Sequence, residues 1–190
     1  GKEIFSQWFV IDGPADIKVN FANEENSLSF TSTPGNAISM LVNTTGNNGT
    51  VYVDWGTGTR NEYTGLRKYT SGSASIGGER IDGTASGTGK VTIYGDVAAL
   101  DISGFGEYGA LMGLWDNQVT EIDLSNAAEL LYLNTYWNPI STVNLSGTPQ
   151  LEVLNMGYND LKTIDLSATP NLMWLDLHSD GFGEDGISML

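Results

Sequence analysis

The chain of 190 residues has no cysteine and only one histidine, His178. The absence of cysteine excludes thiol catalysis, disulfide bonds and cysteine-ligated zinc, although it does not fix the compartment. Basic residues are also scarce: 8 Lys and Arg stand against 23 Asp and Glu, for a formal net charge of -15. Such a surface repels the phosphate backbone of nucleic acids and the headgroups of anionic membranes, so neither is an expected partner.

Long apolar runs are absent as well, since no stretch approaches the ~20 residues that a helix needs to cross a bilayer. No secretory leader is apparent, which fits either a cytosolic protein or the mature form of an exported one. The turns are rich in Gly, Asn and Thr, and this composition favours export. With 40% apolar residues, the chain has enough hydrophobic material for a packed core.

Residues 1–95 contain no repeat and predict short strands separated by turns. Turn residues follow one another about every 8–12 positions, a spacing typical of a β-sandwich. The segment Ser71–Gly89 is dense in Gly, Ser and Thr and is expected to form a long loop or a hairpin excursion, and a domain boundary is expected near Gly95 and Asp96. The predicted strands are Ile4–Ile11, Asp16–Phe21, Ser27–Ser32, Ala37–Asn43, Val51–Trp55 and Lys90–Tyr94.

Residues 119–181 repeat one pattern three times with a period of 21 residues. The copies are VTEIDLSNAAELLYLNTYWNP, ISTVNLSGTPQLEVLNMGYND and LKTIDLSATPNLMWLDLHSDG. Self-similarity at a fixed period indicates stacked units, none of which buries its apolar face alone. A degenerate first copy precedes them, and the apolar residues 187–190 are expected to cap the far end. The second domain, 96–190, therefore contains the repeats 97–118, 119–139, 140–160 and 161–181.

One repeat fits the leucine-rich-repeat template L-x-x-L-x-L-x-x-N at residues 151–160. Leu151, Leu154 and Met156 are predicted to point inward, and a second extended stretch is predicted to form the opposite wall. The short connections and their prolines disfavour a helix. Each repeat is therefore expected to give one strand to a parallel sheet. Thr135 departs from the pattern at an inward position, so its hydroxyl needs a partner and a soft spot is expected there.

A column of polar residues recurs at Asn138, Asn159 and Asp180. We expect a ladder in which these side chains satisfy backbone amides in the turns. Calcium binding by this column, or by the column at positions 123, 144 and 165, is the alternative.

The 21-residue unit, with I/L-D-L-S followed by L-x-x-L, resembles the short repeats of bacterial surface leucine-rich-repeat proteins. Similar repeats occur in internalin J-like proteins of Gram-positive pathogens and in lipoproteins of gut Bacteroidetes. The segment VYVDWGTGTRNEYT at 51–64 resembles the signature of PKD-like immunoglobulin-type sandwiches, with Thr57 where the motif usually has Asp. The resemblance implies a mainly β chain: an N-terminal immunoglobulin-like (PKD-like) β-sandwich at 1–95, followed by a short leucine-rich-repeat solenoid with a parallel sheet. It also implies an exported or lipid-anchored protein at the outer cell surface.

In leucine-rich repeats, the residues that flank the inward leucines of each strand form the concave, ligand-binding face. Rigid aromatic rings are typical of binding hot spots, and neighbouring amides and acids suit polar recognition. The alternative is that these rings pack on one another merely to cover the sheet. The predicted ligand-binding residues are Trp115, Tyr132, Asn134, Tyr136, Trp137, Asn155, Tyr158, Trp174, Asp176 and His178.

Enzyme activity is not expected. The segment GTASGTGK at 83–90 imitates a phosphate-binding loop, but it is one residue too long and Val91 replaces the Ser or Thr that would bind magnesium. His178 has Asp176 nearby without a nucleophile or an oxyanion hole in the pattern. We therefore predict a non-catalytic adhesion protein without cofactor or metal that binds a protein partner. A glycan-binding module and a structural spacer of the cell envelope are the alternatives.

Overall fold

The computed structural model describes residues 26–73, 76–104, 117–178, 180–181 and the backbone of 187–188, and within this part of the chain every regular element is a strand. The prediction of a mainly β chain is therefore confirmed. The predicted strands Ile4–Ile11 and Asp16–Phe21 lie outside the described residues. The described part of the chain contains no helix of the length and hydropathy needed to cross a membrane.

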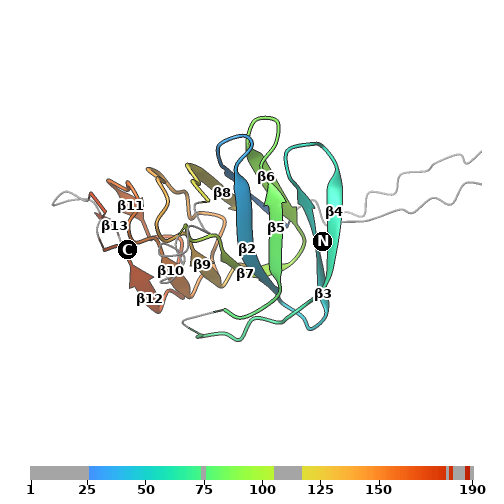
Figure 1. Ribbon diagram of the computed structural model, residues 1–190. Coiled ribbons are helices and arrows are strands. Elements are labelled where there is room, and N and C mark those ends of the chain that lie inside the picture. The colour runs from blue at the N-terminus through green and yellow to red at the C-terminus, as the bar shows by residue number, and fades with distance from the viewer. Residues whose placement is uncertain (1–25, 74–75, 105–116, 179, 182–186, 189–190) are drawn as a thin grey trace, which may run out of the picture.

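The first sheet has five antiparallel strands in the order β4-β3-β6-β1-β8 (Figure 1). Alternate residues of these strands face the core, and Val51 and Val53 on β3 are fully buried between exposed or half-buried neighbours. The strand bounds are β1 (Ser27–Thr31), β3 (Gly49–Asp54), β4 (Arg60–Leu66), β6 (Lys90–Tyr94) and β8 (Glu121–Asn126).

The second sheet has six strands in the order β12-β10-β9-β7-β2-β5. Its β5–β2–β7 part is antiparallel, whereas β7, β9, β10 and β12 run parallel and follow one another toward the C-terminal end (Figure 1). The bounds are β2 (Ala37–Thr44), β5 (Arg80–Thr84), β7 (Val97–Asp101), β9 (Tyr132–Asn134), β10 (Val153–Asn155) and β12 (Trp174–Asp176).

Three strands, β4, β5 and β7, were not among those predicted from the sequence. β7 pairs with β9 in a register 33 residues apart, as from Ala99 to Tyr132, so the degenerate first copy does not keep the 21-residue spacing. β5 lies inside the segment expected to be a long loop or a hairpin excursion. It instead pairs with β2, because Ile81 alternates with the exposed Arg80 and Asp82 and fills the core. β4 has only one buried apolar residue, Leu66. A strand with a single inward hydrophobic residue leaves too weak an alternation to be recognised among polar neighbours.

The repeats form two facing walls. The parallel strands β9, β10 and β12 make one wall. The other consists of β8, an isolated parallel bridge between Asp123 and Asn144, and the pair β11 (Ile164–Asp165) and β13 (Ile187–Ser188). Leu151, Leu154 and Met156 are fully buried between the walls, as predicted.

The repeat pattern in the sequence begins near residues 95 and 96, but the hydrophobic core is continuous across this position. β1 pairs with β8, and β2 pairs with β7, so both sheets contain strands from each side of this position. Buried side chains from both sides belong to one hydrophobic cluster. The N-terminal strands therefore provide the surface on which the first repeat packs.

Candidate functional site

The outer face of the parallel strands carries side chains in rows set by the strand register. The first row consists of Ala99, Tyr132, Val153 and Trp174. Tyr132 was predicted to be exposed for ligand binding, and that prediction is wrong because only 3% of its surface is accessible. The ring of Tyr69 packs on it with centroids 5.8 Å apart.

The segment after β4 therefore covers part of the face that the sequence suggested was open. Glu152 holds this segment in place, because its carboxylate accepts hydrogen bonds from the Ser71 hydroxyl at 2.6 Å and from the Gly72 amide at 2.8 Å. Burial raises the pKa of Tyr69 to about 12, with a further contribution from the Glu152 charge. Burial likewise raises the pKa of Tyr132. These phenols stay neutral and serve as packing groups.

The second row consists of Asp101, Asn134, Asn155 and Asp176. In each case the side-chain Oδ1 accepts a hydrogen bond from the amide two residues later, at 2.9 to 3.3 Å. These bonds close the turn that follows each strand. Asn134 and Asn155, predicted to contact a ligand, are half-buried and have this turn-closing role.

Beyond these turns, four side chains gather into what we call the aromatic cluster: Tyr136, Trp137, Tyr158 and His178. Trp137 and Tyr158 stack with centroids 4.6 Å apart and planes 16° apart. Tyr136 contacts both rings and His178, and His178 lies 4.7 Å from Tyr158. Trp137 and Tyr158 are 42% and 39% exposed, so the cluster is accessible to a ligand. All four residues were among those predicted from the sequence.

The backbone under the two exposed rings is unusual. Trp137 has φ 58° and Tyr158 has φ 56°, which places both in the left-handed region. That conformation costs a residue with a Cβ about 1–2 kcal/mol, and glycine or asparagine adopts it more readily. Bulky aromatic residues at two such positions, 21 residues apart, are the kind of strain that concentrates at functional sites.

Gly157 makes the cluster possible. It occupies the position between Tyr136 and His178 in the repeat register, and a Cβ there would lie 2.8 Å from His178 Nδ1 and 3.1 Å from Tyr136 Cε2. The two rings meet over this glycine, and the Tyr136 hydroxyl lies 3.3 Å from His178 Nε2. Sequence analysis did not single out Gly157, although its place between two large residues in one column was a signal.

The asparagine ladder predicted from the sequence is confirmed. Asn138 Oδ1 accepts from the Val119 amide at 2.8 Å, and Asn159 Oδ1 accepts from the Ile140 amide at 3.2 Å. Their Nδ2 groups donate to backbone carbonyls, including that of Thr135. The ladder fixes the turns from which the exposed rings project, because each asparagine directly follows Trp137 or Tyr158.

Asp180 continues this ladder with a carboxylate. Its Oδ1 accepts from the amides of Asn159 and Leu161 at 3.1 and 3.3 Å, and its buried Oδ2 has no partner among the described residues. Burial raises the pKa of Asp180, assisted by the charge of Asp160 and opposed by these amides. The folded state therefore binds this proton more tightly than the unfolded state. The stabilisation that follows from this proton is fully present at a pH below the pKa of Asp180 in the unfolded chain. It is lost as the pH rises through the higher pKa of Asp180 in the folded protein.

Thr135, where a soft spot is predicted, is a buried polar residue within the repeats. Its side chain is fully buried at the position that Met156 occupies in the next repeat, and its hydroxyl has no hydrogen-bond partner among the described residues. By contrast, the buried threonine hydroxyls in the turns of the opposite wall are satisfied, since Thr148 donates to the Leu145 carbonyl at 2.9 Å and Thr169 to the Leu166 carbonyl at 2.8 Å.

The remaining predicted residues lie apart from the cluster or outside the described part of the chain. Trp174 is 56% exposed on the edge strand β12 beside Met173 and Leu175, where it borders an apolar hollow of about 420 Å³. No ring contact joins Trp174 to the cluster within the described residues. Trp115 lies outside them. Of the ten residues predicted to bind a ligand, the four of the aromatic cluster thus form one contiguous site.

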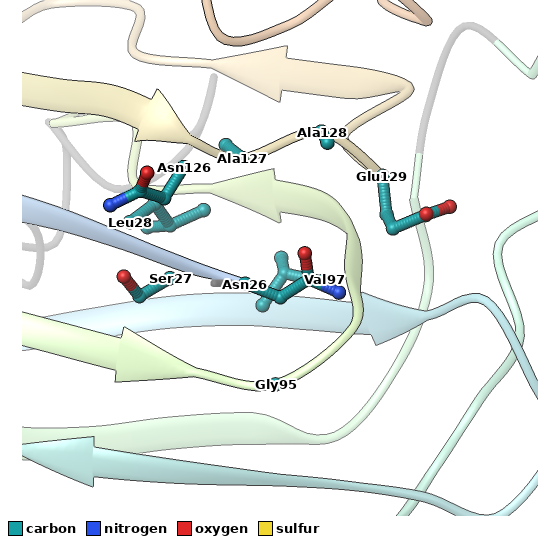
Figure 2. Close-up of a pocket in the computed structure, with 9 residues that line it drawn as sticks. All are labelled: Asn26, Ser27, Leu28, Gly95, Val97, Asn126, Ala127, Ala128 and Glu129. Carbon is teal, nitrogen blue, oxygen red and sulfur yellow. The ribbon is translucent and has the colours of Figure 1, made fainter. Parts of the chain in front are cut away.

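Figure 2 shows a pocket at the junction of the two halves, where the turn before β7 meets the end of β8. Its volume of about 10 Å³ is at the limit for one water molecule, so it is a packing defect and not a ligand site. Its lining residues are Asn26, Ser27, Leu28, Gly95, Val97, Asn126, Ala127, Ala128 and Glu129.

The aromatic cluster contains the only histidine of the chain, His178. His178 Nδ1 lies 2.5 Å from Asp176 Oδ1, which fixes the ring, but the only hydroxyl bonded to its Nε2 within the described residues is the phenol of Tyr136. The described residues contain no group of three or more acidic or histidine side chains placed to hold a metal ion. Comparisons with protein-family models, with curated proteins and with solved structures found no match.

Proposed function

We propose that this chain is a non-catalytic, exported binding module of the cell surface whose aromatic cluster binds a protein partner. The proposal includes an immunoglobulin-like, PKD-like sandwich followed by leucine-rich repeats. The 21-residue period supports the repeat assignment, because it equals the chain length between neighbouring strands from β9 to β12, as from Val153 to Trp174.

The observation that carries the binding function is the left-handed backbone at Trp137 and Tyr158. A turn residue whose only role is structural is best served by glycine or asparagine at such a φ. Large rings kept there in spite of strain, and left about 40% exposed, favour a role in contacting something outside the chain. Aromatic side chains supply much contact area at low entropic cost, as protein hot spots require.

The test compares the full chain with the double variant Trp137→Gly/Tyr158→Gly. Glycine fits the left-handed backbone, so the variant keeps its turns and loses only the rings. The matched control is Trp174→Ala, which removes an even more exposed ring outside the aromatic cluster. The readout is the affinity for a surface protein first captured by the native chain, then purified.

We expect the double variant to bind this partner at least about tenfold more weakly, a loss of about 1.4 kcal/mol, while Trp174→Ala retains its affinity. Equal capture by all three chains overturns the proposal. If the native chain instead binds one sugar class on a glycan array and the double variant does not, the ligand is a polysaccharide. A flat exposed indole also suits sugar stacking, so both assays belong in the same experiment.

A further inference from the structure

We infer that the aromatic cluster receives an arginine side chain of the protein partner, an inference that rests on the binding function proposed above. The rings of Trp137 and Tyr158 stack on each other and are exposed, and the His178 side chain beside them is exposed too. A guanidinium group is planar and more weakly hydrated than an ammonium group, so it stacks on an aromatic face more readily. This makes arginine the basic residue best matched to the cluster.

The charges beside the cluster favour a cation. Asp176 lies against His178, and its Oδ2 accepts no hydrogen bond from the described residues. Asp180 is close enough for its charge to interact with His178 and with Asp160. Between residues 97 and 181, eleven Asp and Glu stand against a single Lys or Arg, namely Lys162, whose Nζ lies beside Gly181. The local potential therefore attracts a basic segment and repels an acidic one.

The repeat register supplies a variant that removes charge without disturbing the turn. Asn134 and Asn155 occupy the same row as Asp176 and close their turns with the same Oδ1 bond. Asp176→Asn therefore keeps this bond and removes the negative charge beside His178. Asp101→Asn is the matched control. It makes the same change at the other end of the row, three strands or about 14 Å away.

The probe is a triarginine peptide, compared with a tricitrulline peptide of the same shape without charge and with a trilysine peptide. Binding to every chain is measured by isothermal titration calorimetry, and in chains that keep Trp137 its indole N–H resonance in ¹H–¹⁵N spectra reports binding at the aromatic cluster. We expect triarginine to bind about tenfold more tightly than tricitrulline, and trilysine to lie between them. Asp176→Asn should weaken triarginine binding by about fivefold, Asp101→Asn by less than about twofold, and Trp137→Gly should abolish it.

Equal affinity for arginine and citrulline peptides overturns the inference. So does an equal effect of the two Asp→Asn variants, because that would mean a general attraction to the acidic surface. The proposed function fails separately. If partner binding depends on Trp137 but triarginine does not compete with the partner, the binding function stands and the arginine inference falls. If triarginine binds as expected and no partner depends on the cluster, the proposed function falls.

Discussion

Replacing Thr135 by valine should make the protein more stable. The side chain is fully buried, and its hydroxyl has no partner among the described residues. Valine has nearly the same shape and removes the polar group. An unsatisfied buried hydroxyl costs about 1–3 kcal/mol, so the free energy of unfolding should rise by about 1 kcal/mol once imperfect packing is allowed for. For a chain of this size, that corresponds to an increase in Tm of about 2–4 °C.

Thr148→Val is the matched control. That threonine is equally buried, but its hydroxyl donates to the Leu145 carbonyl at 2.9 Å, so the same substitution should destabilise by about 1 kcal/mol. Urea unfolding, followed by circular dichroism at fixed pH, measures both changes, and an unchanged m-value shows that they reflect stability alone. If Thr135→Val lowers stability as Thr148→Val does, the Thr135 hydroxyl is hydrogen-bonded and the reasoning is refuted.

Asp180→Asn should stabilise the protein at pH 7, because asparagine carries no charge to bury. The native protein should lose stability as the pH rises above 3.8, and the variant should lose less; urea unfolding at a series of pH values measures both. Gly157→Ala should push the Tyr136 and His178 rings apart at a cost below about 1 kcal/mol, visible as changed ring-current shifts; unchanged shifts would contradict the predicted clash. Asn138→Ala should lower the free energy of unfolding by at least about 2 kcal/mol, because it leaves several buried backbone groups unpaired. Thermal unfolding measures this loss, and an unchanged stability would show that the ladder does not stabilise the fold.

Periodic features of the sequence translated directly into structure. The strands at Ala37–Thr44 and Lys90–Tyr94, the inward leucines and the asparagine ladder could all be predicted, since each depends on local alternation or on a repeat. β5 could not, because a strand with one inward residue is specified by the partner strands and not by its own pattern.

The candidate site was predictable in its residues but not in its boundaries. The rows of side chains follow from the register, and they placed Tyr136, Trp137, Tyr158 and His178 correctly as neighbours. The burial of Tyr132 could not be foreseen, since it depends on a segment more than 50 residues earlier in the chain. Contacts of that range leave no trace in a local pattern.

The pairing of β1 with β8 and of β2 with β7 has a consequence for biosynthesis. A nascent chain that has emerged only as far as residue 95 presents two unfilled strand edges. That of β2 gains its partner with β7 (Val97–Asp101), whereas that of β1 stays open until β8 (Glu121–Asn126) has emerged. The pairing of β1 with β8 joins segments that lie far apart in the sequence, and pairings of this kind form slowly. We expect the ribosome-bound fragment to remain sensitive to protease and prone to self-association, and to gain protection in a single late step once β8 is available.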